Sequence, residues 1–150
     1  MLIYLGSDHR GFKLKEFIKT YLKDNGYQIH DVGNVKYDPA DDYPDFAKAV
    51  AENVAADPDG RRGVVFCGSG VGVDIVANKF DRVRSVLANT PDQVMVSRVD
   101  DDTNVLSVAA DFINPEDAKR MIAIWLQTPF SKEERHKRRL DKIGEIEKNN

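Results

Sequence analysis

The chain alternates short apolar runs with longer amphipathic runs over nearly its whole length. Short runs of β-branched and aromatic residues are typical of buried strands, and apolar residues at every third or fourth position are typical of helices. This alternation predicts an α/β fold with a mainly parallel sheet, because parallel strands need a crossover, usually a helix, between them. We expect strands at residues 2–6, 27–32, 64–67, 83–88 and 104–109, and helices at 12–23, 43–56, 73–80, 91–99, 115–126 and 132–148.

Length and composition narrow the class of protein. A chain of 150 residues has the size of one domain, so we expect residues 1–150 to form a single domain without a second one. The single cysteine excludes an internal disulfide and a Cys-based zinc site, which fits a reducing cytoplasm. The N-terminus has neither the charged start of a signal peptide nor a membrane span. With a net charge of −3 and no basic stripe interleaved with aromatics, neither nucleic acid nor membrane is an expected partner.

The segment Val64–Val73 joins an expected strand, the only cysteine and a glycine-rich turn that opens a helix. Cys67 would lie at the carboxyl end of the strand, where unpaired backbone N–H groups and the positive end of a helix dipole favour a thiolate. The same N–H groups could hold a substrate oxygen that becomes negative during a reaction. Two interpretations stay open here: a reactive thiol, or a cysteine packed as a small hydrophobe.

Ligands of an open parallel sheet bind beyond the carboxyl ends of its strands. Residues with reactive side chains lie next to three expected strands: Ser7 to Gly11 after the first, Cys67 to Gly70 after the third, and Asp100 to Asn104 before the fifth. A carboxylate, an imidazole and a thiol could therefore meet in one crevice. The alternatives are that Asp8 caps a helix beside a solvated His9, and that the acidic run 100–102 is a solvated turn.

The last expected helix has few apolar residues, namely Leu140, Ile143 and Ile146. So thin a stripe predicts that residues 132–148 dock on something outside their own core. Arg135 and Arg139 are four residues apart, which puts both guanidinium groups on one helical face, as bidentate phosphate binding requires. The alternative is a basic face in solvent.

Taken together, the motifs resemble those of the ribose-5-phosphate isomerase type B family, which includes the galactose-6-phosphate isomerase subunits. The segments that carry the resemblance are Gly6–His9 with Gly11, Asp42–Pro44, Cys67–Gly72, Ala77–Lys79 and Asp102–Leu106, and it runs from residue 1 to about 147. The resemblance implies a Rossmann-like three-layer αβα sandwich with a five-stranded parallel sheet. It also implies a homodimer, often paired into a tetramer, and aldose–ketose isomerisation through a cis-enediolate without a metal or other cofactor.

The resemblance assigns a role to each matching position. Cys67 matches the base that moves a proton between C1 and C2 of the sugar, and Ser69 a hydroxyl beside the substrate oxygens. The backbone N–H groups that match the family's anion hole belong to Gly68, Gly70, Val71 and Gly72. The matched sugar contacts are Asp8 and Asn104, with His9 near the phosphate or ring oxygen and Tyr43 as an aromatic wall. Arg135 and Arg139 match phosphate-binding arginines that come from the neighbouring subunit.

Two positions depart from the family pattern, and both make the expected site more negative. Asp100 stands where the family has a ring-opening histidine, and an aspartate is ordinarily ionised at pH 7 unless burial or neighbours such as Asp101 and Asp102 favour protonation. Asp111 stands where the family commonly has a phosphate-facing arginine, and Arg10 or His136 are the candidates to compensate.

Three functional alternatives follow from these departures. The protein is a sugar-phosphate isomerase in which Asp100 or His9 opens the ring, or an isomerase of an unphosphorylated sugar that hydrogen-bonds Asp111, or a sugar-binding or partner-dependent subunit. The positions around Cys67 that match the family favour the first, with Arg10 and Asp111 among the residues that bind substrate.

Overall fold

The computed structural model describes residues 1–149 and has five strands and six helices within them. The strands are β1 (Leu2–Ser7), β2 (Gln28–Gly33), β3 (Arg61–Cys67), β4 (Ser85–Leu87) and β5 (Val105–Ala109). The helices are α1 (Phe12–Asp24), α2 (Tyr43–Ala56), α3 (Val71–Ala77), α4 (Pro91–Asp101), α5 (Pro115–Gln127) and α6 (Glu134–Lys148).

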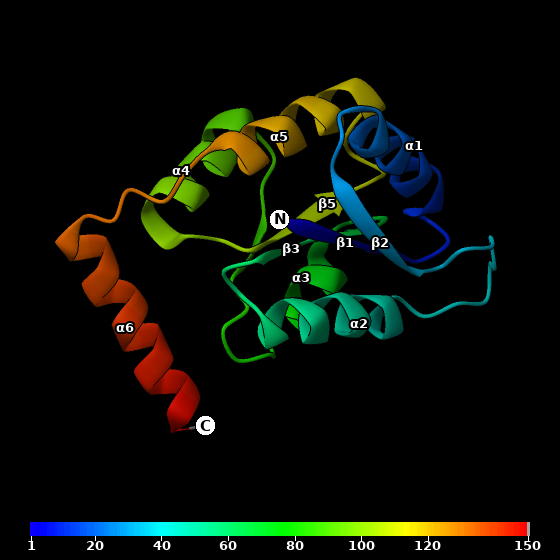
Figure 1. Cartoon of the computed structure of the whole chain (residues 1–150). Coiled ribbons are helices and arrows are strands. Elements are labelled where there is room, and N and C mark those ends of the chain that lie inside the picture. The colour runs from blue at the N-terminus through cyan, green and yellow to red at the C-terminus, as the bar shows by residue number, and fades with distance from the viewer. Residues whose placement is uncertain (150) are drawn as a thin grey trace.

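All four strand pairs are parallel, and the sheet order is β2-β1-β3-β5-β4. Helices α1, α4 and α5 cover one face of the sheet and α2 and α3 cover the other (Figure 1). The fold is therefore the expected Rossmann-like sandwich of three layers. The central strand β3 lies between β1 and β5, so the loops that follow these three strands meet where the carboxyl ends of the strands lie. We call this end of the sheet the Cys67 edge, because Cys67 is the last residue of β3.

Two apolar clusters fill the spaces between the sheet and the helices. Side chains of a strand alternate between its two faces, and in β3 Val64 and Phe66 face the cluster with α1 and α5, whereas Val65 and Cys67 face the cluster with α2 and α3. Trp125, fully buried in the first cluster, donates its ring N–H to the Thr103 hydroxyl at 3.0 Å. The alternation places the only cysteine on the α2/α3 face at the end of the central strand.

The largest differences from the expected strand boundaries are at β3 and β4. β3 begins at Arg61 instead of residue 64, because its first residues pair with the start of β1. β4 is a three-residue edge strand, Ser85–Leu87, instead of 83–88, and it pairs only with β5. The bounds of β1, β2 and β5 differ from the expected ones by a single residue at one end or at both.

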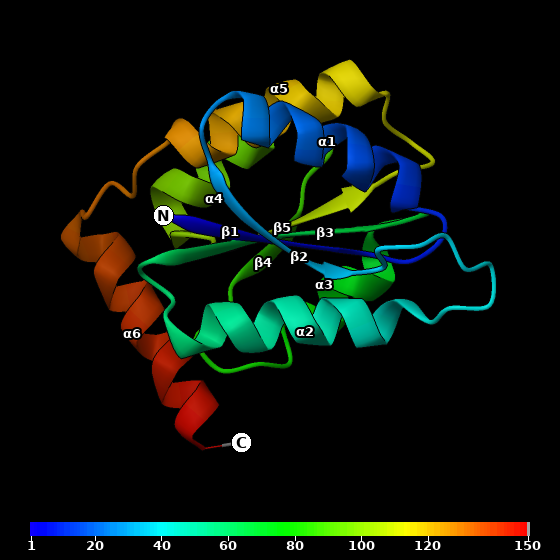
Figure 2. The same cartoon turned by 45° about the vertical axis from the view of Figure 1, so that its right-hand side comes forward.

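Helix α6 stands apart from the three layers (Figure 2). It lies toward the side of the molecule where β1 begins, and its apolar residues Ile143 and Ile146 remain 39% and 61% exposed. They line an open groove of about 410 Å³ against the start of β4. The thin apolar stripe thus stays largely uncovered within one protomer. None of the helices formed by residues 1–149 is both long and apolar enough to cross a membrane.

Candidate active site

The Cys67 thiol is buried at the carboxyl end of β3 and accepts a hydrogen bond from the Gly70 N–H, with 3.1 Å between Sγ and N. Gly70 has a φ of +74°, which favours glycine, and a Cβ there would lie 2.5 Å from the Leu87 side chain. The turn therefore depends on glycine both for its conformation and for its close approach to β4. It brings a backbone N–H donor to the sulfur.

The turn leads directly into α3. The first N–H groups of a helix have no partner within it, and the Val71 N–H is bound by the Ser69 hydroxyl at 3.3 Å. Gly72 packs against the ring of Tyr43, the first residue of α2, since a Cβ on Gly72 would lie 2.6 Å from that ring. The structure thus places Ser69, Tyr43 and the Gly68–Gly72 backbone around one point beside Cys67.

The loop after β1 lies at the same edge. Asp8 is buried, and its carboxylate accepts the Gly11 N–H at 2.9 Å. It therefore fixes the turn before α1 but is not the N-cap of that helix, which is Gly11. Gly11 touches the end of β3 so closely that a Cβ would lie 2.6 Å from the Phe66 backbone. The loop is thereby held against the strand that ends in Cys67.

His9 is held by a residue that the sequence reasoning missed. Asp41 Oδ1 accepts the His9 backbone N–H at 2.9 Å and lies 2.7 Å from its ring Nδ1. Burial alone would raise the pKa of Asp41, but the hydrogen bonds from His9 and from the Asn34 amide outweigh it, so the pKa lies below its ordinary value. An ionised Asp41 accepts a hydrogen bond from Nδ1 and leaves Nε2 of His9 for a ligand.

The departure at Asp111 and the candidate that was expected to compensate for it, Arg10, form one feature. The Arg10 guanidinium forms an ion pair with the Asp111 carboxylate across the end of β3. Asp111 is further fixed by its own N–H, which donates to the Gly68 carbonyl at 3.0 Å. The negative charge expected at Asp111 therefore has a positive partner within the chain.

Asp100 and Asn104 are not at this edge, which corrects the expected crevice. Both precede β5, and the residues before a parallel strand lie at the opposite edge from those after it. Asp100 Oδ1 lies 3.6 Å from Nε2 of the buried His136 in α6. Asp102, expected to repel Asp100, is instead paired with Arg84 at 3.1 Å and Arg98 at 2.7 Å.

The expected sugar contact of Asn104 is wrong for a physical reason. Asn104 is fully buried, its Oδ1 accepts the Arg84 N–H at 2.8 Å, and its Nδ2 donates to the Arg82 carbonyl at 2.8 Å. Both ends of the amide are used to join the segment before β4 to the start of β5. Asn104 is a structural residue of the sheet.

Arg135 and Arg139 are exposed on α6, away from the Cys67 edge of their own chain (Figure 2). Arg135 pairs with Glu133 at 2.8 Å. His136, named as a possible compensating cation, is buried between them, with Nδ1 bonded to the Ser131 hydroxyl at 2.7 Å. Within one protomer, none of these three side chains reaches the thiol.

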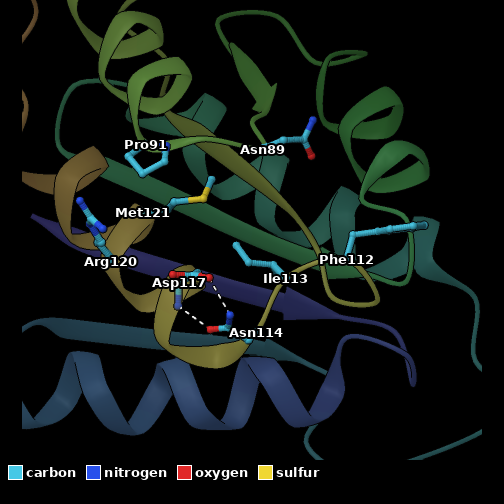
Figure 3. Close-up of a pocket in the computed structure, with 8 residues that line it drawn as sticks. All are labelled: Asn89, Pro91, Phe112, Ile113, Asn114, Asp117, Arg120 and Met121. Atoms are coloured by element: carbon cyan, nitrogen blue, oxygen red, sulfur yellow. Dashed lines mark hydrogen bonds between the residues drawn. The ribbon is translucent and has the colours of Figure 1, made fainter.

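A separate pocket of about 300 Å³ lies where β4 and β5 lead into α4 and α5 (Figure 3). Its floor includes Met121, and the Asn114–Asp117 hydrogen bonds cap α5 at its rim. None of the expected site residues lines it. The site argued from the sequence is thus the Cys67 edge and not this pocket.

Comparisons with known proteins identify the family to which this fold belongs. The family model of the ribose/galactose isomerases matches residues 3–143. Ribose-5-phosphate isomerase B of Mycolicibacterium paratuberculosis is 38% identical over 148 residues, which cover 99% of this chain and 92% of the relative. This chain belongs to the ribose/galactose isomerase family.

Solved structures of family members superpose closely on the fold. The structure of ribose-5-phosphate isomerase B from Mycoplasma genitalium with bound ribulose-5-phosphate matches with a TM-score of 0.96 at 36% identity, covering 99% of this chain and 97% of the other. The type B enzyme of Trypanosoma cruzi matches with a TM-score of 0.94 at 37% identity over the full length of both chains. The isomerase fold is therefore complete in this protein.

Proposed function

We propose that the protein is an aldose–ketose isomerase that interconverts ribose 5-phosphate and ribulose 5-phosphate through a cis-enediolate. One observation carries the proposal: the Cys67 sulfur is held by the Gly70 N–H inside a glycine turn at the carboxyl edge of the sheet. A base and a set of oxyanion donors are thereby side by side, as proton transfer next to a carbonyl requires. Family membership over residues 3–143 supports the substrate class.

In the proposed reaction the Cys67 thiolate removes the proton from C2 of the open-chain aldose. The electron pair of that C–H bond forms the C1–C2 double bond, and the negative charge moves to the carbonyl oxygen. Backbone N–H groups of the Gly68–Gly72 turn stabilise this charge, and the Ser69 hydroxyl lies beside the two oxygens. The proton of the C2 hydroxyl passes to O1 through the Ser69 hydroxyl, and O2 becomes the carbonyl oxygen. The thiol protonates C1, where the electron pair of the C1–C2 double bond forms the new C–H bond, which yields the ketose and restores the thiolate.

The remaining residues of the edge bind the sugar. The Asp8 carboxylate and the Nε2 atom of His9 contact hydroxyl or ring oxygens, and Tyr43 forms a wall beside the turn. Asp41 keeps His9 in one orientation. His9 is the candidate for opening the furanose ring within the same chain, since its loop packs on the end of β3 and its Nε2 is left for a ligand.

A second copy of the chain completes the site. Arg135 and Arg139 sit on a helix whose apolar stripe is uncovered within one protomer, and Asp100 lies next to that helix. We propose that α6 of one protomer docks on its partner in a homodimer. The two arginines then bind the phosphate of the partner's substrate, and Asp100 is the candidate ring-opening group from that side.

The test is isomerisation by the purified protein with paired panels of sugars. Ketose formation is followed from ribose 5-phosphate and from free ribose, and from a hexose 6-phosphate and its free aldose. The proposal expects turnover of ribose 5-phosphate by the wild type, its loss in Cys67→Ala, and full turnover in Lys13→Ala, an exposed α1 residue. If only free sugars were converted, the proposal that the substrate carries a phosphate would be contradicted. If no sugar were converted, the proposal that the protein is an aldose–ketose isomerase would be contradicted.

A further inference from the structure

The Arg10–Asp111 ion pair crosses the end of the central strand. Arg10 lies three residues after β1 and Asp111 two residues after β5, and β3 separates these strands in the sheet. A side-chain contact between the two loops must therefore pass over the end of β3, which is Cys67, and over Gly68 that follows it.

Gly68 shows how closely the pair lies on that segment. A Cβ on Gly68 would be 2.4 Å from Arg10 Nε and 2.8 Å from Asp111 Oδ2. Only glycine leaves room there for the two charged groups. Because neighbouring Cα atoms are about 3.8 Å apart, the guanidinium lies within about 8 Å of the Cys67 Cα, a separation that an extended five-carbon sugar phosphate can bridge.

The guanidinium retains donors for a ligand. An arginine has five N–H groups, and Arg10 uses one nitrogen, Nη2, for Asp111; among residues 1–149 it makes no other hydrogen bond. Its side chain is 58% exposed. A guanidinium that is fixed on one side and open on the other is suited to forked hydrogen bonds with a phosphate.

We propose that Arg10, held over Gly68 by Asp111, binds the phosphate of the substrate, and that Asp111 is its positioning residue. The inference rests on the proposed function and adds a phosphate contact from the same chain as Cys67. It replaces the expectation that Asp111 repels phosphate, because the carboxylate is paired with Arg10.

The pair implies a coupling between the two positions that can be measured. With Arg10 present, the charge of Asp111 is compensated. Without Arg10, Asp111 is an unpaired carboxylate at the phosphate position and opposes binding. Removing the carboxylate should therefore weaken phosphate binding in the wild type, where Asp111 positions Arg10, and strengthen it in the Arg10→Ala background, which is a non-additive cycle.

The experiment uses the whole enzyme and compares KM and kcat for ribose 5-phosphate, together with competitive inhibition by inorganic phosphate. The variants are Arg10→Ala, Asp111→Asn, their double variant, and Arg10→Ala with Asp111→Arg, which presents a guanidinium over Gly68 from the other loop. Lys13→Ala is the control for loss of one exposed positive charge near α1. Circular dichroism checks that each variant folds.

The inference expects Arg10→Ala to raise KM and the phosphate inhibition constant by about tenfold or more, with kcat changed less than about threefold, as the loss of charge-assisted hydrogen bonds predicts. Asp111→Asn raises KM in the wild type, because Arg10 loses the carboxylate that positions it, and lowers KM in the Arg10→Ala background. Asp111→Arg restores phosphate inhibition in the Arg10→Ala background. The proposal is overturned if Arg10→Ala changes KM no more than Lys13→Ala does, or if Asp111→Asn acts equally in both backgrounds. A wild type that fails to isomerise ribose 5-phosphate refutes the proposed function instead.

Discussion

Asp100 Oδ1 lies 3.6 Å from Nε2 of His136, so the residue in the position of the expected ring-opening group is joined to α6 and not to the Cys67 edge. Asp100, Arg135 and Arg139 thus share one end of the protomer, and Cys67 lies at the other. If all of them serve one active site, that site is built from two chains.

Mixing two inactive variants tests the shared site. We expect Cys67→Ala and Arg139→Ala each to lose most activity. In mixed dimers one of the two sites receives an intact cysteine from one chain and an intact arginine from the other. Random reassortment should therefore restore about a quarter of wild-type activity in an equimolar, co-refolded mixture. A mixture as inactive as its components, in a protein that sediments as a dimer, would show that each site uses one chain only.

The His9–Asp41 contact predicts a second effect on activity. Asp41→Asn removes the ionised acceptor that fixes the tautomer of His9, and we expect kcat/KM for ribose 5-phosphate to fall by about tenfold. Because the pKa of Asp41 is lowered in the folded protein, the wild type should keep this contact down to acidic pH. The pH profile of kcat/KM, measured for both proteins, checks the prediction, and Asp38→Asn in the same loop is the control. If wild type and Asp41→Asn had equal pH profiles and equal rates, Asp41 would have no role in the active site.

The Lys15–Asp31 ion pair predicts a pH-dependent stability. Lys15 is fully buried, and its Nζ lies 2.7 Å from Asp31 Oδ2, to which Lys19 is also bonded. Burial alone would raise the pKa of Asp31, but the hydrogen bonds from Lys15 and Lys19 outweigh burial, so the pKa lies below its ordinary value. Stabilisation from a lowered carboxyl pKa is fully present above the unfolded value of about 4 and is lost as the pH falls through the folded value.

Urea unfolding of Asp31→Asn tests that account. We expect its free energy of unfolding at pH 7 to be about 3 kcal/mol below wild type, since the buried Lys15 ammonium loses its nearer carboxylate partner and keeps only Glu16, at 3.1 Å. The difference should shrink below pH 4, where wild-type Asp31 becomes protonated. The exposed Asp24→Asn should change stability by less than about 0.5 kcal/mol. A difference between Asp31→Asn and wild type that stays constant from pH 7 to pH 3 would contradict the linkage.

A pair of glycines separates backbone strain from crowding. Gly70 and Gly26 have φ values of +74° and +79°, but a Cβ at Gly26 meets nothing within 4 Å, whereas one at Gly70 meets Leu87 and Ala109. Gly26→Ala should cost about 1 kcal/mol and leave activity intact. Gly70→Ala should destabilise more and abolish isomerisation, because the donor to Cys67 moves. Thermal unfolding and turnover of both variants check this, and an active Gly70→Ala enzyme would show that the turn geometry is not needed.

The features that the sequence predicted correctly are local. A buried strand, one cysteine and a glycine turn are consecutive residues, so their placement follows from strand and helix signals alone. Two contacts of the site join loops that are far apart in the sequence: Asp41 lies 32 residues from His9, and Asp111 lies 101 residues from Arg10. No periodic pattern in the sequence predicts such contacts.

The error at Asn104 has a topological cause. Its polar side chain follows an acidic run and precedes a strand, and in a parallel sheet the residue before a strand lies at the edge opposite the ligand site. The side-chain amide of Asn104 forms hydrogen bonds there with the backbone of residues 82 and 84. Counting only residues that follow strands would have left Asn104 and Asp100 out of the crevice of their own chain.

The most direct test of the central claim follows hydrogen exchange at C1 of ribulose 5-phosphate in D₂O by proton NMR. This ketose has its C5 oxygen bound to phosphate and forms no furanose ring, so exchange reports proton transfer without ring opening. The account predicts rapid loss of one C1 proton signal with wild type and with Lys13→Ala, and a rate lower by about a thousandfold with Cys67→Ser. Exchange that survives in Cys67→Ser would contradict the role of Cys67 as the base.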